Sequence, residues 1–153
     1  MKKIIAGVDE VGRGSLVGPV YAAAVILNKE INRKILKDSK KLNKIQRETL
    51  AKYIKKNSVW ALGSASIKEI EKINILNASL LSMKRAIKKL KLKPKKILID
   101  GNKPPDLKNY VIKTIVKGDE KIPEISAASI IAKVERDKPV SYTHLTLPTT
   151  LLV

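Results

Sequence analysis

The sequence predicts an α/β domain in which a mixed central β-sheet is flanked by α-helices. Apolar runs typical of buried strands come first, and segments with helical periodicity then alternate with further apolar runs. The chain has 153 residues and is 44% hydrophobic, which suffices for one buried core. We therefore expect one domain over residues 1–138, without internal repeats, followed by a tail over residues 139–153.

The first half of the chain is predicted to form three strands and one helix. Apolar runs over Lys2–Asp9 and Pro19–Leu27 are typical of buried strands, and the second follows a turn-forming Gly-Pro pair. A polar connector over Asp38–Leu42 leads to a basic amphipathic helix over Lys44–Lys56. Ser58–Ile67 is the third strand. The apolar face of the helix comprises Ile45, Leu50, Tyr53 and Ile54.

The second half is predicted to contain two helices and two strands. The helix over Asn77–Leu92 has an apolar stripe at three- and four-residue steps, and Pro94 ends it. Short strands follow over Lys96–Asp100 and Tyr110–Val116. The helix over Glu124–Asp137 has a small apolar face suited to packing on a sheet. The stripe and the face comprise Leu80, Met83, Ile87 and Leu90, and Ala127, Ile130, Ile131 and Val134.

The tail over residues 139–153 differs abruptly in composition from the domain. It contains no Asp, Glu, Lys or Arg, although the preceding residues are highly charged, and it carries His144, the only histidine. We expect a segment foreign to the domain and exclude it from fold reasoning. The alternative is a native, poorly ordered terminus.

The charge of the chain favours a polyanionic partner. Its 32 Lys and Arg against 14 Asp and Glu give a formal net charge of +18, and nucleic acid is the commonest partner of such proteins. The alternative is a set of solvated basic helix faces. There is no cysteine, and no segment approaches the roughly 20 apolar residues of a membrane span. We expect a cytoplasmic protein without membrane contact.

Acidic residues follow three of the predicted strands. Asp9 and Glu10 close the first apolar run, Asp100 closes a later one, and Asp119 follows a glycine. Neighbouring strands of an α/β sheet bring such ends together, and converging carboxylates hold Mg²⁺ for phosphodiester chemistry. Without metal, their repulsion should raise the pKa of at least one carboxyl group. The alternative for Asp100 or Asp119 alone is a capping or turn residue. Asp137 ends the last predicted helix and is expected to pair with a basic neighbour, with a fifth metal ligand as the alternative.

A Gly-Arg-Gly tripeptide, Gly12 to Gly14, directly follows the paired carboxylates. Glycines let the backbone approach a ligand, and Arg13 between them favours a phosphate. Adjacent strand residues point to opposite faces, so the glycines would also allow the bend that brings Asp9 and Glu10 to one site. Lys40 and Lys41, near Ser39, are candidates for contact with a phosphate backbone, with a solvated basic turn as the alternative.

These segments resemble bacterial ribonuclease HII, of the type 2 ribonuclease H family. The similar blocks occur in family order and extend to about residue 138, after which the tail does not match. Arg13 favours type HII over type HIII. The blocks are Gly7-Val8-Asp9-Glu10-Val11-Gly12-Arg13-Gly14, Gly18-Pro19-Val20, Asp38-Ser39-Lys40-Lys41-Leu42, Ile99-Asp100-Gly101-Asn102, Lys117-Gly118-Asp119, residues 122–134 and Arg136-Asp137.

The resemblance implies a ribonuclease H-like fold and a metal-dependent endoribonuclease. Its substrates would be RNA–DNA hybrids and single ribonucleotides in duplex DNA, cleaved to 5′-phosphate and 3′-hydroxyl ends. Catalysis would use Mg²⁺ or Mn²⁺, with a two-metal site, and the protein would be a monomer. The alternative is a truncated, inactive family fragment that retains nucleic-acid binding. The implied catalytic and metal-binding residues are Asp9, Glu10, Asp100 and Asp119, and the implied substrate-binding residues are Gly12, Arg13, Gly14, Ser39 and Lys40.

Overall fold

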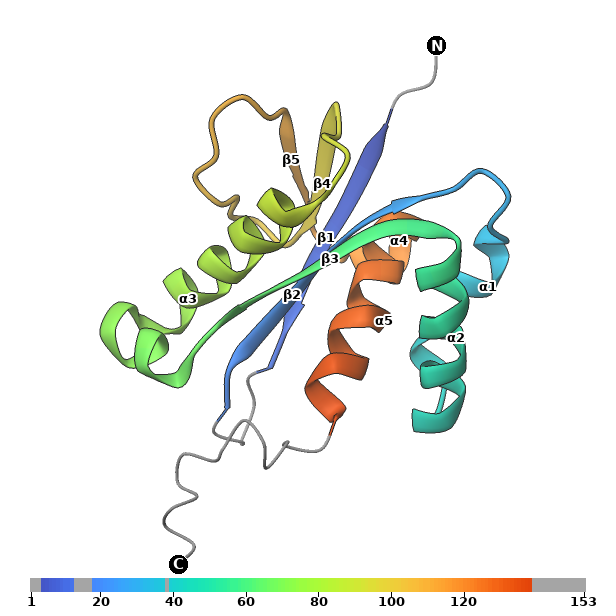
Figure 1. Ribbon diagram of the computed structural model, residues 1–153, viewed down its shortest axis with the longest axis horizontal. Helices are drawn as coiled ribbons and strands as arrows, with labels where there is room; N and C mark the ends of the chain where they lie inside the picture. Colours follow the sequence, from blue (N-terminus) through green and yellow to red (C-terminus); the bar gives the residue numbers. More distant parts are fainter. Residues whose placement is uncertain (1–3, 13–17, 38, 139–153) are drawn as a thin grey trace, which may run out of the picture.

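The computed structural model, which describes residues 4–12, 18–37 and 39–138, contains a five-stranded sheet in the order β3-β2-β1-β4-β5 (Figure 1). β1 is antiparallel to β2 and β2 to β3, whereas β4 is parallel to both β1 and β5. The predicted mixed sheet is therefore confirmed. The strands are β1 (Ile5–Val11), β2 (Val20–Leu27), β3 (Ser58–Ala65), β4 (Lys96–Asp100) and β5 (Ile112–Ile115).

Helices cover both faces of this sheet. Figure 1 shows α3 on one face and α2 and α5 on the other. The short helix α4 directly precedes α5, and a 3₁₀ turn, η1, precedes α2. The helices are α1 (Arg33–Lys37), η1 (Ser39–Lys41), α2 (Lys44–Lys56), α3 (Ile67–Lys89), α4 (Gly118–Lys121) and α5 (Pro123–Asp137).

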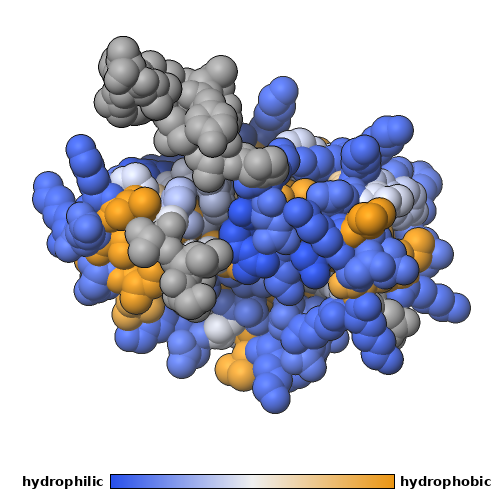
Figure 2. Space-filling model, turned by 90° about the horizontal axis from the view of Figure 1, so that it is seen from below, coloured by the Kyte–Doolittle hydropathy of each residue, from blue (hydrophilic) through white to orange (hydrophobic). Residues whose placement is uncertain are grey.

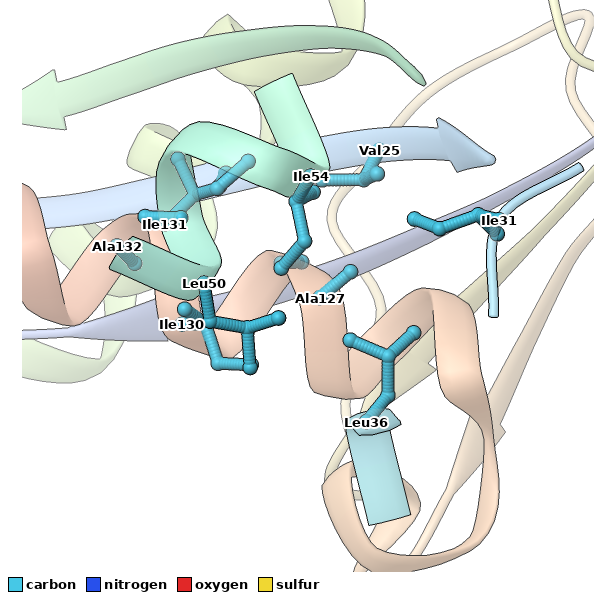
Figure 3. Packing of buried hydrophobic residues seen from close by; sticks show 12 residues of the cluster. Val25, Ile31, Leu36, Leu50, Ile54, Ala127, Ile130, Ile131 and Ala132 are labelled. Carbon is cyan, nitrogen blue, oxygen red and sulfur yellow. The ribbon is translucent and has the colours of Figure 1, made fainter. Parts of the chain in front are cut away.

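The core on the α5 face packs α2 and α5 against the middle of the sheet (Figure 3). Ile54 of α2, Ile131 of α5 and Val25 of β2 are essentially inaccessible to solvent. Small residues allow the close approach: an added Cβ at Gly7 of β1 would lie 2.2 Å from the carbonyl carbon of Glu124. The start of α5 is thus held directly over β1.

The core on the α3 face uses the other side chains of the same strands. Met83 and Ile87 of α3 pack with Val8 of β1 and Ile99 of β4. Alternate residues of a strand point to opposite faces, so β2 contributes Ala23 and Val25 to the core under α5 and Ala22 and Ala24 to the core under α3. This alternation decides on which side of the sheet each acidic residue lies.

Most predicted elements are confirmed, but several features differ. The short helices α1 and α4 were not expected, and α3 begins ten residues before the predicted helix over Asn77–Leu92. Asn74 has non-helical angles (φ 71°, ψ 169°), so α3 consists of two segments, and the Asn74 side chain accepts a hydrogen bond from the Asn77 N–H at 2.9 Å. The expectation that Ile45 lies on the buried face of α2 was wrong, because this side chain is 74% exposed.

The start of α3 is tied to its C-terminal half by an ion pair. Both guanidinium Nη atoms of Arg85 donate to the Glu69 carboxylate, at 2.6 and 2.7 Å, and Glu69 also accepts from the Ser66 N–H. These bonds, the Arg85 contact above all, lower the pKa of Glu69 to about 2. The pair therefore spans the kink in α3.

We expect Glu69→Gln to lower the melting temperature at pH 7 by about 2 °C or less, because the pair is solvent-exposed. The lowered pKa means that the stabilisation is present above the ordinary value of 4.5 and is lost as the pH falls toward 2. Calorimetric scans from pH 7 to 2 test this. The exposed Glu71 provides the control Glu71→Gln, and a difference that persists unchanged at pH 2 would contradict the explanation.

The surface agrees with the high charge of the sequence. The face in Figure 2 is mostly hydrophilic, and its hydrophobic residues form small separate patches. Over the residues that the structure describes, no helix combines the length and apolar character needed to cross a membrane.

Candidate active site

The pairing of β1 with β4 brings two of the predicted site residues together. The parallel register pairs Gly7 with Leu98 and Val8 with Ile99, and the same offset places Asp100 beside Asp9. Both aspartates lie on the α5 side, because the intervening Val8 and Ile99 belong to the core under α3. Residues 91 positions apart in the chain thus meet at the ends of neighbouring strands.

Asp9 is the most deeply buried of these carboxylates, with 7% of its surface exposed. Its pKa is raised well above the ordinary value of 3.8, first by burial and then by Asp100, with smaller contributions from Glu10 and Asp119. The Glu10 N–H donates to Asp9 Oδ1 at 2.8 Å and partly offsets the shift. The predicted rise in a carboxyl pKa is confirmed, although burial rather than repulsion is its largest cause.

Glu10 lies on the other side of β1. β1 stays extended through Val11, and Glu10 pairs with Ala22, which belongs to the core under α3. The turn comes only at Gly12, whose φ is +132° and where an added Cβ would lie 2.7 Å from the Pro19 carbonyl oxygen. The expectation that a bend brings Asp9 and Glu10 to one site was wrong, because the bend follows both carboxylates. Arg13 and Gly14 lie outside the described residues.

Asp119 reaches Asp100 from the short helix α4. Its backbone N–H points to Asp100 Oδ1 at 3.4 Å. The preceding Gly118 is buried, and an added Cβ there would lie 2.5 Å from Ile125 Cδ1 of α5. Close packing of Gly118 against α5 therefore places Asp119 beside the ends of β1 and β4.

Lys40 joins this acidic group from the turn before α2. Its ammonium lies 3.2 Å from Asp119 Oδ2 and 3.1 Å from Glu120 Oε2. The hydrogen bonds to Glu120 and to Asp119 raise the pKa of Lys40. In this structure the proposed phosphate contact thus pairs with carboxylates.

Ser39 holds the same turn against α5. Ser126 Oγ donates to the Leu36 carbonyl at 2.9 Å, so its single proton is used there. In the 3.2 Å contact between the two hydroxyls, Ser39 is therefore the donor and Ser126 the acceptor. Ser39 positions Lys40, and its hydroxyl is engaged within the protein.

Two members of this arrangement were missed from the sequence. Glu120 lies next to the predicted Asp119, and Ser126 lies among the small residues of α5. Adjacency to Asp119 was the available signal for Glu120, whereas nothing local distinguishes Ser126. The expected ion pair of Asp137 with a basic neighbour is confirmed, because Arg136 Nε lies 3.0 Å from its Oδ1. Arg47 Nη1 of α2 also lies 3.1 Å from Asp137 Oδ2.

The donor atoms suit a hard cation, because the carboxylate of Asp100 on β4 lies beside the buried Asp9 of β1 and Asp119 of α4 adjoins Asp100. Burial and then the repulsion from Asp100 raise the pKa of Asp9, and a bound cation would offset both effects. Within the described part of the chain, however, no three Asp, Glu or His side chains are arranged as a ready-made metal site. The separation of Glu10 on the far side of β1 accounts for part of this.

Comparison with known proteins decides the family. A family model described as Ribonuclease HII matches residues 6–150. The ribonuclease HII of Pelagibacter ubique (strain HTCC1062) is 75% identical over 136 residues, which cover 89% of this chain and 73% of that protein. The chain belongs to the ribonuclease HII family. The expected family and the enzyme class, a ribonuclease, are therefore confirmed.

Solved structures support the ribonuclease H-like fold of this ribonuclease HII family member. Ribonuclease H2 from Pyrococcus horikoshii OT3 has a TM-score of 0.76 and 30% identity, covering 95% of this chain and 76% of that one. Bst-RNase HIII in complex with Mn²⁺ has a TM-score of 0.75 and 22% identity, covering 97% and 56%. This second likeness concerns the fold alone. The predicted ribonuclease H-like fold is confirmed.

Proposed function

We propose that this member of the ribonuclease HII family cleaves RNA in RNA–DNA hybrids and incises duplex DNA at single embedded ribonucleotides. The products would carry 5′-phosphate and 3′-hydroxyl ends. The observation that carries the proposal is the pairing of β1 with β4, which puts the buried Asp9 beside Asp100 with Asp119 at hand. Carboxylates gathered at strand ends are suited to metal-assisted phosphodiester hydrolysis.

Two divalent ions, Mg²⁺ or Mn²⁺, are proposed as cofactors. Asp9, Glu10 and Asp100 would be the principal ligands, and Asp119 would complete the site and help to position a metal ion or water. Bound metal would polarise the scissile phosphate, lower the pKa of the attacking water and stabilise the leaving 3′-oxygen. Mn²⁺ is an appropriate second ion to test, because the Bst-RNase HIII structure contains it.

The other predicted residues would bind and orient the nucleic acid. Gly12, Arg13 and Gly14 are proposed to recognise the 2′-hydroxyl, the group that distinguishes RNA from DNA. Lys40 would hold a phosphate oxygen beside Asp119, and Ser39 would keep the Lys40 turn against α5. We further propose that the enzyme acts as a monomer in the cytoplasm, in keeping with a chain without cysteine.

Incision of a defined duplex tests the proposed activity. A DNA duplex with one ribonucleotide is incubated with Mg²⁺ or Mn²⁺ and the folded protein, and the products are resolved by electrophoresis. Ligation and primer extension then identify the 5′-phosphate and 3′-hydroxyl ends. Salt-dependent binding without metal-dependent incision would instead support the alternative, an inactive family fragment that retains nucleic-acid binding.

Metal binding is expected to stabilise the protein measurably. At a Mg²⁺ concentration of about 100 times Kd, the melting temperature should rise by about 5 °C or more. Asp100→Asn should reduce this rise, whereas Glu48→Gln, at an exposed position of α2, should retain it. Differential scanning fluorimetry at constant ionic strength measures the effect. An equal rise in wild type and Asp100→Asn would exclude Asp100 from the metal site.

A further inference from the structure

A lysine-lined pocket lies on the α3 side of the molecule, apart from the residues of the candidate active site. It has a volume of about 350 Å³ and lies between the C-terminal half of α3 and the connection from β4 to β5. Figure 1 shows this connection passing beside α3. Its lining comprises Lys84, Lys88, Asp106, Leu107, Lys108 and Asn109.

The wall of the pocket opposite α3 is anchored to the core. Leu107 and Tyr110 pack against the cluster that contains Met83 and Ile87 of α3. The Lys93 ammonium lies 5.0 Å from the centre of the Tyr110 ring, which ties the end of the connection to the segment after α3. The lysines of the two walls are therefore held facing one cavity.

The pocket is strongly cationic. Its lining sets three ammonium groups against the single carboxylate of Asp106. Within the described residues, Lys84, Lys88 and Lys108 form no ion pair. The surrounding chain adds to this charge, because residues 72–99 contain nine Lys or Arg and no Asp or Glu.

We propose that this lysine pocket binds the phosphate backbone of the substrate duplex, away from the cleaved bond. Lysines act as point charges toward phosphates and carry no sequence preference, as a contact outside the reaction centre requires. The pocket is also near enough to be reached by the same duplex. Lys108 follows Asp100 by eight residues, which span at most about 28 Å, or about 8 base pairs.

This inference rests on the proposed function, which identifies the duplex that the pocket binds. Its test distinguishes failure of the pocket proposal from failure of the proposed activity. The variant Lys84→Gln/Lys88→Gln/Lys108→Gln removes the pocket charges and retains side-chain length. The matched control Lys29→Gln/Lys34→Gln/Lys52→Gln removes three exposed charges from the connection after β2, from α1 and from α2. A cooperative melt establishes that each protein is folded.

Binding is measured without divalent metal on duplexes that contain one ribonucleotide, over a range of KCl concentrations. With a duplex of about 30 base pairs, the slope of log Kd against log salt should fall by about 2 to 3 in the pocket variant and much less in the control. A hairpin-closed duplex of about 8 base pairs with its ribonucleotide at the centre extends only about 14 Å to each side, so wild type and pocket variant should differ less on it than on the long duplex. If the triple variant fails to fold, Lys108→Gln alone should lower the slope by about 0.9.

An unchanged slope in the pocket variant, or an equal fall in the control, would overturn the proposal. If the pocket instead binds an acidic protein, the salt slope measured with duplex DNA should not change in the pocket variant. Incision of the short duplex with Mg²⁺ reports separately on the active site. If wild type and all variants fail to incise the duplex, the proposed activity is contradicted. If the salt slope still falls only in the pocket variant, the proposal for the lysine pocket remains supported.

Discussion

Asp9→Asn should abolish incision almost completely while leaving the protein folded. Asp9 is buried beside Asp100, and a neutral amide there would weaken the hold on both proposed ions. Metal-ion catalysis contributes several kcal/mol to transition-state stabilisation, so we expect a loss of about 10³-fold or more in the single-turnover rate at saturating Mg²⁺. Glu48→Gln, which also removes one carboxylate, should retain the wild-type rate.

The same substitution should stabilise the metal-free protein. The raised pKa means that ionised Asp9 opposes folding. Below the ordinary value of 3.8, Asp9 is protonated in both states and exerts no effect; stability is lost as the pH rises through the folded-state pKa. At pH 7 with chelator, Asp9→Asn should therefore melt at a higher temperature than wild type, and the difference should disappear near pH 3.8.

These two measurements together separate catalysis from folding. Loss of incision with a raised melting temperature supports a metal-binding role for Asp9. Loss of incision with a lowered melting temperature would mean that the variant is inactive because its structure is damaged. Wild-type incision by Asp9→Asn would remove Asp9 from the mechanism.

Gly7→Ala should destabilise the fold more than any exposed substitution. The new Cβ would lie 2.2 Å from the Glu124 carbonyl carbon and 2.4 Å from both the Glu124 oxygen and the Ile125 nitrogen. These are backbone atoms, so α5 itself would have to move. Overpacking of this kind costs about 3 kcal/mol, which corresponds to a fall of about 10 °C in melting temperature for a chain of this size.

Gly18→Ala is the matched control, because an added Cβ there meets no atom of the described residues within 4 Å. Its melting temperature should stay within about 1 °C of wild type. Displacement of α5 should also disturb Ser126 and the adjoining α4, so Gly7→Ala should lose incision at temperatures where it is still folded. A melting temperature equal to that of Gly18→Ala would show that α5 does not press on β1.

Local features of the chain were sufficient to predict most of the elements. The bounds of α2 and β4 agree with the predicted ranges because capping residues, proline and apolar runs mark their ends. The first segment of α3 was missed because the positive φ of Asn74 breaks the helix, so one continuous helical period does not extend through both segments. Ile45 was misplaced because periodicity predicts a face but does not reveal how far the neighbouring elements extend over it.

The sequence by itself determined the family and the residue types of the site: paired carboxylates after an apolar run, Gly-Arg-Gly, and further aspartates after strands. Only the tertiary structure decided which of them meet. Parallel pairing of β1 with β4 puts Asp100 beside Asp9, and packing of Gly118 on α5 brings Asp119 to them. The alternation along β1 turns Glu10 to the other face. These relations depend on contacts between distant segments, and no local pattern encodes them.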